Sequence, residues 1–187
     1  MDRQGRRSVG QVCVPGEHGI DGLGQPSTAR LVCIDKRNHV ELSEAINSMF
    51  KWYRGTKKCY VYLPDVSIPE DSKYLFTQYY WEPVFRKSNW FARGWTLQEP
   101  IAPVSVEFFS LKGKLLGNRK SLKHQIHEIT RINIQALQGG SSSQFDFAER
   151  MSWARYRDTR VEEDSVYCLL GICDILVRRR RDETMRG

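Results

Sequence analysis

The stretch LVCIDKRNHVELSEAINSMFKWYRGTKKCYVYL, residues 31–63, decides the fold class. It opens with a short apolar run, LVCI at 31–34, and closes with CYVYL at 59–63, which is rich in β-formers and shows no polar alternation. Such runs are typical of strands covered on both faces. Between them, the apolar residues of 38–53 recur at helical spacing. Strand, helix and strand in this order indicate a βαβ unit, and hence a parallel sheet.

The helix of this unit has a recognisable start. Asn38 followed three residues later by Glu41 resembles a capping box, in which each polar side chain satisfies an exposed backbone amide. The pattern places the first helical residue at His39 or Val40.

The segment at 64–103 is rich in aromatic residues and interrupted by prolines, which predicts short helices separated by turns. Further elements are predicted after it. VSVEFFS at 104–110 and KLLG at 114–117 flank a Lys-Gly turn and predict a hairpin. A helix is expected within 121–129, followed by a flexible loop, LQGGSSSQ, at 137–144.

Two more helices are expected in 146–157 and 159–177. Thr159 and Glu162 form a second capping box, which predicts that the last helix begins there. Its expected buried stripe consists of Val166, Leu169, Leu170, Cys173 and Leu176.

Composition limits the class of protein. The 187 residues are 40% hydrophobic and 11% aromatic, which suits one domain with a core. No apolar run approaches the roughly 20 residues that cross a bilayer, and the N-terminus lacks a secretory signal, so we expect an intracellular protein that does not bind membranes. The five cysteines sit mostly in apolar runs, which predicts reduced, buried thiols and no zinc site.

The net charge of +7 does not indicate a nucleic-acid-binding protein. Much of the excess lies in the four arginines at 178–181, near the C-terminus, while the other basic residues are interleaved with acids. We therefore divide the chain into an irregular or disordered leader (1–30), one domain (31–177) and a basic tail (178–187).

Three blocks resemble successive blocks of the fungal heterokaryon-incompatibility (HET) domain. They are CIDKRNHVELSEAINSMFKWYRGTKKCYVYLPDV at 33–66, FARGWTLQEPIAPVSVEFF at 91–109 and AERMSWARYRDTRVEEDSVYCLLGI at 148–172, and their order and spacing agree with the family. The segments that the family carries before Leu31 and after Ile175 are replaced here by other sequence, so we expect a partial domain, truncated at both ends.

The resemblance implies a fold and a role. The expected fold is α/β and similar to Toll/interleukin-receptor (TIR) domains, with a flavodoxin-like parallel sheet, flanking helices and a helical C-terminal part, here incomplete. The expected role is that of a cytoplasmic effector in non-self recognition, whose activation leads to programmed cell death. Some TIR domains cleave NAD, so NAD is an expected substrate, and no cofactor is implied.

A site that cleaves the nicotinamide–ribose bond would need a carboxylate, an aromatic surface and cations. Glu99 is the predicted catalytic carboxylate, with Trp95 and Arg93 supplying the other two types. The remaining members of the predicted cluster are Gln98, Arg157, Arg160 and Asp164. Pro100 disfavours the α conformation at Glu99, so the local helix is expected to end there.

The same residues also fit a structural role. Arg93–Glu99 or Arg157–Asp164 would then be ion pairs, Trp95 part of the core, and Gln98 a side chain that bonds loop backbone. Three functions therefore stay open. One is a signalling module with protein partners or self-association through the aromatic middle segment, the second is an NAD-cleaving enzyme that uses Glu99, and the third is a non-functional truncated gene copy.

Overall fold

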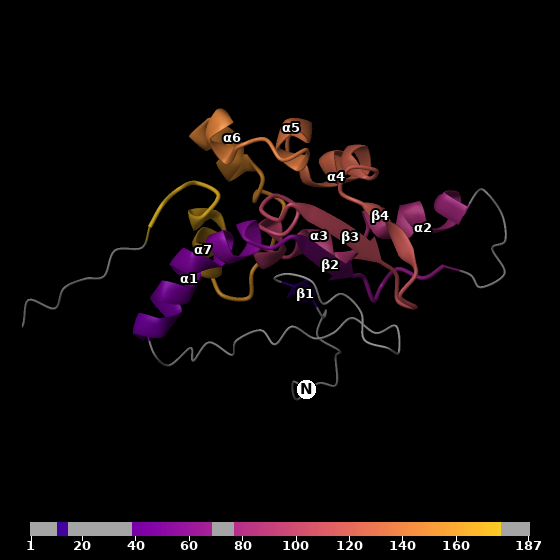
Figure 1. The fold of residues 1–187 in the computed structure, drawn as a ribbon, viewed down its shortest axis with the longest axis horizontal. Helices are drawn as coiled ribbons and strands as arrows, with labels where there is room; N and C mark the ends of the chain where they lie inside the picture. The colour runs from indigo at the N-terminus through magenta and orange to yellow at the C-terminus, as the bar shows by residue number, and fades with distance from the viewer. Residues whose placement is uncertain (1–10, 15–38, 69–76, 177–187) are drawn as a thin grey trace, which may run out of the picture.

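The computed structural model describes residues 11–14, 39–68 and 77–176, and these form a small sheet surrounded by helices (Figure 1). The four strands lie in the order β1-β2-β3-β4. β1 (Gln11–Val14) pairs antiparallel with β2 (Lys58–Tyr62), β2 pairs parallel with β3 (Ser105–Phe109), and β3 pairs antiparallel with β4 (Leu115–Asn118). The mixed α/β class is confirmed.

The prediction of a parallel sheet is correct for only one of these pairings. β3 and β4 form the predicted hairpin, and a tight turn can join only antiparallel neighbours. The parallel pair is β2 and β3, and its crossover contains α2 (Thr77–Arg86), α3 (Asn89–Ala92) and the 3₁₀-helix η1 (Trp95–Leu97). The predicted strand at 31–34 lies outside the described residues. β1 corrects the prediction that all of 1–30 is irregular, because its backbone pairs with β2.

Two central strands carry the core of the sheet. Cys59 and Val61 of β2 stand opposite Val106 and Phe108 of β3, and all four side chains are buried on one face. The alternate residues are partly covered, except Lys58 at the start of β2, which is exposed. The sequence predicted a strand that is covered on both faces. In the structure one face is buried and the other is only partly covered.

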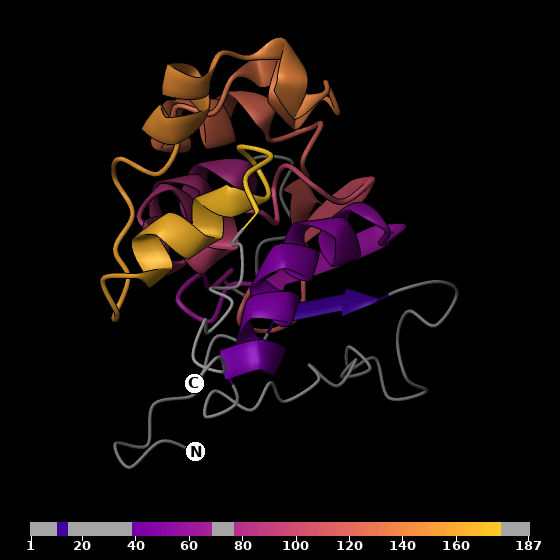
Figure 2. The same cartoon turned by 90° about the vertical axis from the view of Figure 1, so that its left-hand side faces the viewer.

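Several helices begin where local sequence places them. α1 (His39–Arg54) starts at the predicted residue, and α4 (Lys123–Thr130) occupies the predicted segment. α4, α5 (Ile134–Leu137) and α6 (Phe147–Ser152) lie together on one side of the sheet in both views (Figures 1 and 2). The expected loop at 137–144 contains the end of α5 and a second 3₁₀-helix, η2 (Ser142–Gln144).

The last helix is shorter than predicted. α7 spans Asp164–Leu170, so the capping box at Thr159 does not start it. Long-range hydrogen bonds explain the difference, because the amide of Asp158 donates to Ala92 O (2.6 Å) and the amide of Gly94 donates to Asp158 O (2.9 Å). These bonds hold the chain extended just before Thr159. In the predicted stripe, Leu169, Leu170 and Cys173 are buried, whereas Val166 and Leu176 are exposed.

The aromatic middle segment fills the core. Phe85 packs edge-to-face against Trp81, Phe91 and Phe108, with ring centroids 5.1–5.6 Å apart. Trp90 meets Phe108 in the same geometry at 5.5 Å. These residues are buried and belong to the core, whereas Tyr80 of the same segment is exposed, so a contact surface of this segment would not include the buried rings.

α1 and α7 lie side by side, and a glycine makes this possible. A Cβ atom built on Gly171, just after α7, would lie 2.1 Å from Cβ of Phe50 in α1. Any larger residue would force the two helices apart. No helix in the described part of the chain is long and apolar enough to cross a membrane.

Candidate functional site

The fold brings the second and third sequence blocks together, as the predicted cluster requires. Arg93 and Asp158 form an isolated parallel bridge, with the two backbone hydrogen bonds given above. Gly94 lies at the closest approach, where an added Cβ would meet Cγ2 of Thr159 at 2.4 Å. We call this contact between 92–99 and 157–168 the block junction.

Glu99 lies inside the block junction and is fully buried. Its Oε2 accepts a hydrogen bond from Nε1 of Trp90 at 3.1 Å. The helix was expected to end at Glu99, before Pro100; η1 already ends at Leu97, and Glu99 lies in the following turn. The carboxylate therefore faces an indole of the core and has no exposed surface.

Arg157 is the cation of the block junction. Its Nη1 donates to the carbonyl oxygen of Arg93 and to Oγ1 of Thr96, both at 2.9 Å. Among the described residues, no acceptor bonds its buried Nε and Nη2. Burial lowers the pKa of Arg157 to about 10, and the nearby carboxylate of Glu99 opposes this change. The guanidinium thus stays charged at neutral pH beside Glu99.

Gln98 ties the block junction to the last helix. Its side chain is buried, and Nε2 donates to the carbonyl oxygen of Cys168 at 3.0 Å. The structural alternative predicts a bond to loop backbone, whereas the acceptor here is the backbone of the last helix, α7. Burial raises the pKa of the Cys168 thiol to about 11, with the charge of Arg157 acting in the opposite direction.

The other predicted members lie differently. The side chains of Arg93 and Arg160 are exposed, Asp164 is half-buried at the start of α7, and Trp95 packs partly buried against the core. The structure therefore brings Glu99, Gln98 and Arg157 together and leaves the two arginine side chains at the surface. Arg93 contributes its backbone carbonyl, which accepts from Arg157.

Sequence reasoning missed three partners in the block junction: Trp90, Thr96 and Cys168. Thr96 lies three residues before Glu99, so a search for polar side chains beside the carboxylate would have found it, whereas the contact with Trp90 depends on tertiary packing. Cys168 contributes through its backbone carbonyl. Every residue has this group, so the amino-acid type at position 168 could not have indicated the contact.

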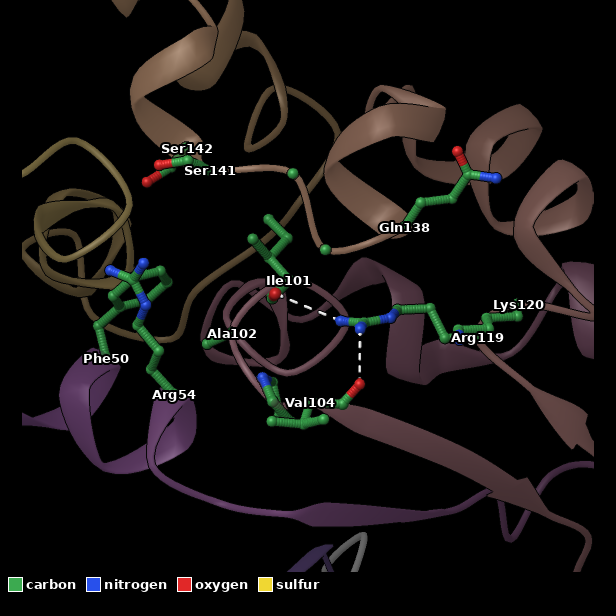
Figure 3. A pocket seen from close by; sticks show the side chains of 13 residues that line it. Phe50, Arg54, Ile101, Ala102, Val104, Arg119, Lys120, Gln138, Ser141 and Ser142 are labelled. Atoms are coloured by element: carbon green, nitrogen blue, oxygen red, sulfur yellow. Dashed lines mark hydrogen bonds between the residues drawn. The ribbon is translucent and has the colours of Figure 1, made fainter.

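A pocket of about 440 Å³ lies among residues that follow Pro100 in the chain and residues of three other segments (Figure 3). Its walls come from α1, the segment after Pro100, the corner between β4 and α4, and the loop that follows α5. Lining side chains that carry charge are Arg54, Arg119 and Lys120. None of these was predicted as a site residue.

The described residues offer no metal site, since they contain no group of three or more His, Cys, Asp or Glu side chains that could hold an ion. Cys59, Cys168 and Cys173 are free and buried, as predicted for reduced thiols.

Comparison with known proteins decides the family. The chain is 52% identical over 143 residues to the vegetative incompatibility protein HET-E-1 of Podospora anserina. The chain belongs to the fungal heterokaryon incompatibility family. The match covers 76% of this chain and spans 10% of the length of HET-E-1. No protein-family model and no solved structure matches the chain, so neither comparison bears on a TIR-like fold.

Proposed function

We propose that this member of the heterokaryon incompatibility family acts as an effector or signalling module in fungal non-self recognition, in the cytoplasm. The 52% identity to HET-E-1, a protein named for vegetative incompatibility, carries the proposal. Because the match spans a tenth of that protein, the proposal concerns only a module of this size.

The geometry of the block junction supports a module with one defined arrangement. A carboxylate and a guanidinium are buried together and fixed by hydrogen bonds to an indole, a hydroxyl and a backbone carbonyl. Removing one partner of a buried pair of charges is costly, so the pair favours the packing in which Glu99 and Arg157 stay together. Such a module would transmit its signal through protein partners or self-association.

The alternative, cleavage of NAD by Glu99, is less well supported. It needs a substrate to reach the carboxylate, and Glu99 is fully buried with Trp90 bonded to it. A TIR-like arrangement is supported by the parallel β2–β3 pair, whereas the antiparallel outer pairs argue against it.

Inducible expression in Podospora anserina tests the module. We expect growth arrest with loss of viability on induction of the wild-type chain. Arg157→Ala should abolish this effect because it breaks the block junction, and Arg155→Ala, which changes a nearby exposed arginine, should not. Normal growth of a strain in which the folded wild-type chain accumulates would contradict the proposal.

A parallel assay separates the enzyme from the module. Purified protein is incubated with NAD, and release of nicotinamide is followed for the wild type and Glu99→Gln. The module predicts no turnover by either protein. Turnover that Glu99→Gln abolishes without a change in the circular dichroism spectrum would instead support the enzyme.

A further inference from the structure

The charged side chains that line the pocket are all basic. Its lining includes two arginines and a lysine, Arg54, Arg119 and Lys120, and no acidic residue. Its volume of about 440 Å³ is within the usual range of small-molecule sites. A cavity that gathers cations without carboxylates attracts anions, because field lines concentrate in a concave, partly dry site.

Arg119 is a buried cation at the wall of this pocket. Only 4% of its surface is exposed, and its Nη1 and Nη2 donate to the carbonyl oxygens of Pro100 (3.0 Å), Ile101 (3.3 Å) and Val104 (2.9 Å). Figure 3 shows the guanidinium pointing from the β4–α4 corner toward the middle of the pocket. These partners are neutral dipoles, so they hold the group in place without cancelling its charge.

Arg119 also has hydrogen-bonding capacity left. Its Nε is buried, and no group in the described part of the chain accepts from it. Burial lowers the pKa of Arg119, which reflects the cost of keeping this charge out of water. An anion in the pocket would reduce that cost, because a buried charge is costly unless it is paired.

The loop at 138–142 completes the polar wall with small residues. Gly139 has φ +94°, a conformation that favours glycine, and a Cβ on Gly140 would lie 2.8 Å from the carbonyl oxygen of Gln135. The loop therefore closes over α5 only with glycines at these positions. Ser141 and Ser142 follow and line the pocket (Figure 3), and the hydroxyl of Ser141 is hydrogen-bonded with that of Ser143 at 2.7 Å.

The remaining wall is apolar. Phe50 from α1 and Ile101 and Pro103 from the segment after Pro100 line it. We propose that the pocket binds a small organic molecule that carries a phosphate or pyrophosphate group, with the phosphate toward Arg119, Arg54 and the two serines and the organic part against Phe50. This assignment does not depend on the function proposed above.

Binding measurements with three probes test the assignment. Isothermal titration calorimetry on the full chain would compare adenosine 5′-diphosphate, inorganic pyrophosphate and adenosine. We expect the diphosphate to bind most tightly, pyrophosphate more weakly and adenosine least, with affinity falling as salt is added. Failure of both phosphate probes to bind at millimolar concentration overturns the proposal, and so does adenosine binding as tightly as the diphosphate.

Variants locate the site. Arg119 holds three carbonyls, so its replacement could unfold the chain, whereas Arg54 is exposed and can be changed without loss of core packing. Arg54→Ala should weaken diphosphate binding about tenfold, as expected for loss of one charge-assisted hydrogen bond. Arg155→Ala removes the same charge outside the pocket and should leave affinity unchanged. Equal loss in both variants, or no loss in Arg54→Ala, contradicts the assignment.

The headgroup of a phospholipid also carries a phosphate group that this pocket would bind. Co-sedimentation with phosphatidylcholine vesicles that contain phosphatidylinositol 4-phosphate separates the two sources. Sedimentation that Arg54→Ala abolishes assigns the phosphate to a lipid. Diphosphate binding without sedimentation assigns it to a soluble molecule.

Discussion

Arg157 shows how one residue fixes the block junction. Its guanidinium lies among Glu99, Thr96 and the backbone of Arg93, in a site where burial lowers its pKa. Arg157→Met keeps much of the side-chain length but leaves the carboxylate of Glu99 buried without its cation. We expect a loss of about 3 kcal/mol in the free energy of unfolding, measured by urea denaturation. Arg155→Met is the matched control, and an equal effect of both changes would contradict this role for Arg157.

Cys168 gives a prediction about pH. Burial raises the pKa of its thiol from 9.0 to about 11, so between these values the unfolded chain loses a proton that the folded chain keeps. The unfolded state then binds fewer protons, and the contribution of Cys168 to stability falls as pH rises through this window. From pH 8 to 10, wild-type protein should lose about 1 kcal/mol relative to Cys168→Ala. Urea unfolding of both proteins at the two pH values checks this, and a constant difference would contradict it.

At the level of residues, the sequence indicated some of the side chains that meet but not how they are arranged. The resemblance to a family grouped Glu99, Gln98 and Arg157, and the structure brings these three together. The burial of Glu99 against Trp90 was not predictable, because it depends on the packing of α3 and η1 onto β3. Arg119 gave no signal either, since its partners are backbone carbonyls.

At the level of elements, local signals succeeded where no distant segment competed. α1 begins at His39 and the β3–β4 hairpin forms around its Lys-Gly turn, because capping and turn chemistry act within a few residues. The predicted start of the last helix failed because backbone bonds from Ala92 and Gly94 hold Asp158 extended. The strand β1 was missed for the same reason, since pairing with β2 overrides a sequence without strand periodicity.

The packing of α7 on α1 can be tested at Gly171. Gly171→Ala would place a Cβ 2.1 Å from Cβ of Phe50, an atom next to the backbone that cannot move unless the helix moves. We expect a loss of about 1–3 kcal/mol in unfolding free energy, as for other overpacked sites. Gly55→Ala, just after α1, is the control. The nearest atom to its added Cβ would be the carbonyl oxygen of Lys51 at 3.4 Å, an ordinary van der Waals contact. Equal urea midpoints for wild type and Gly171→Ala would show that the helices are not in close contact.

Across the whole molecule, the sequence predicted the α/β class but not the strand directions. The pattern of an apolar run, helix and apolar run suggested parallel neighbours, yet the described parallel pair is formed by two strands separated by 42 residues, 63–104, of which the described part contains α2, α3 and η1. Strand direction depends on which distant strand pairs with β2, and periodicity contains no information about that choice.

One core connects most of the described helices and strands, which bears on whether the chain is a stable domain or a remnant. Buried side chains from Phe50 in α1 to Cys173 after α7 form a single cluster that includes Trp81, Trp90 and Trp153. A chain with one continuous core should unfold in a single cooperative step. We therefore expect tryptophan fluorescence and far-ultraviolet circular dichroism to give coincident thermal transitions, with equal calorimetric and van't Hoff enthalpies. Transitions that separate between the two probes would instead indicate a non-functional fragment whose helices pack independently of the sheet.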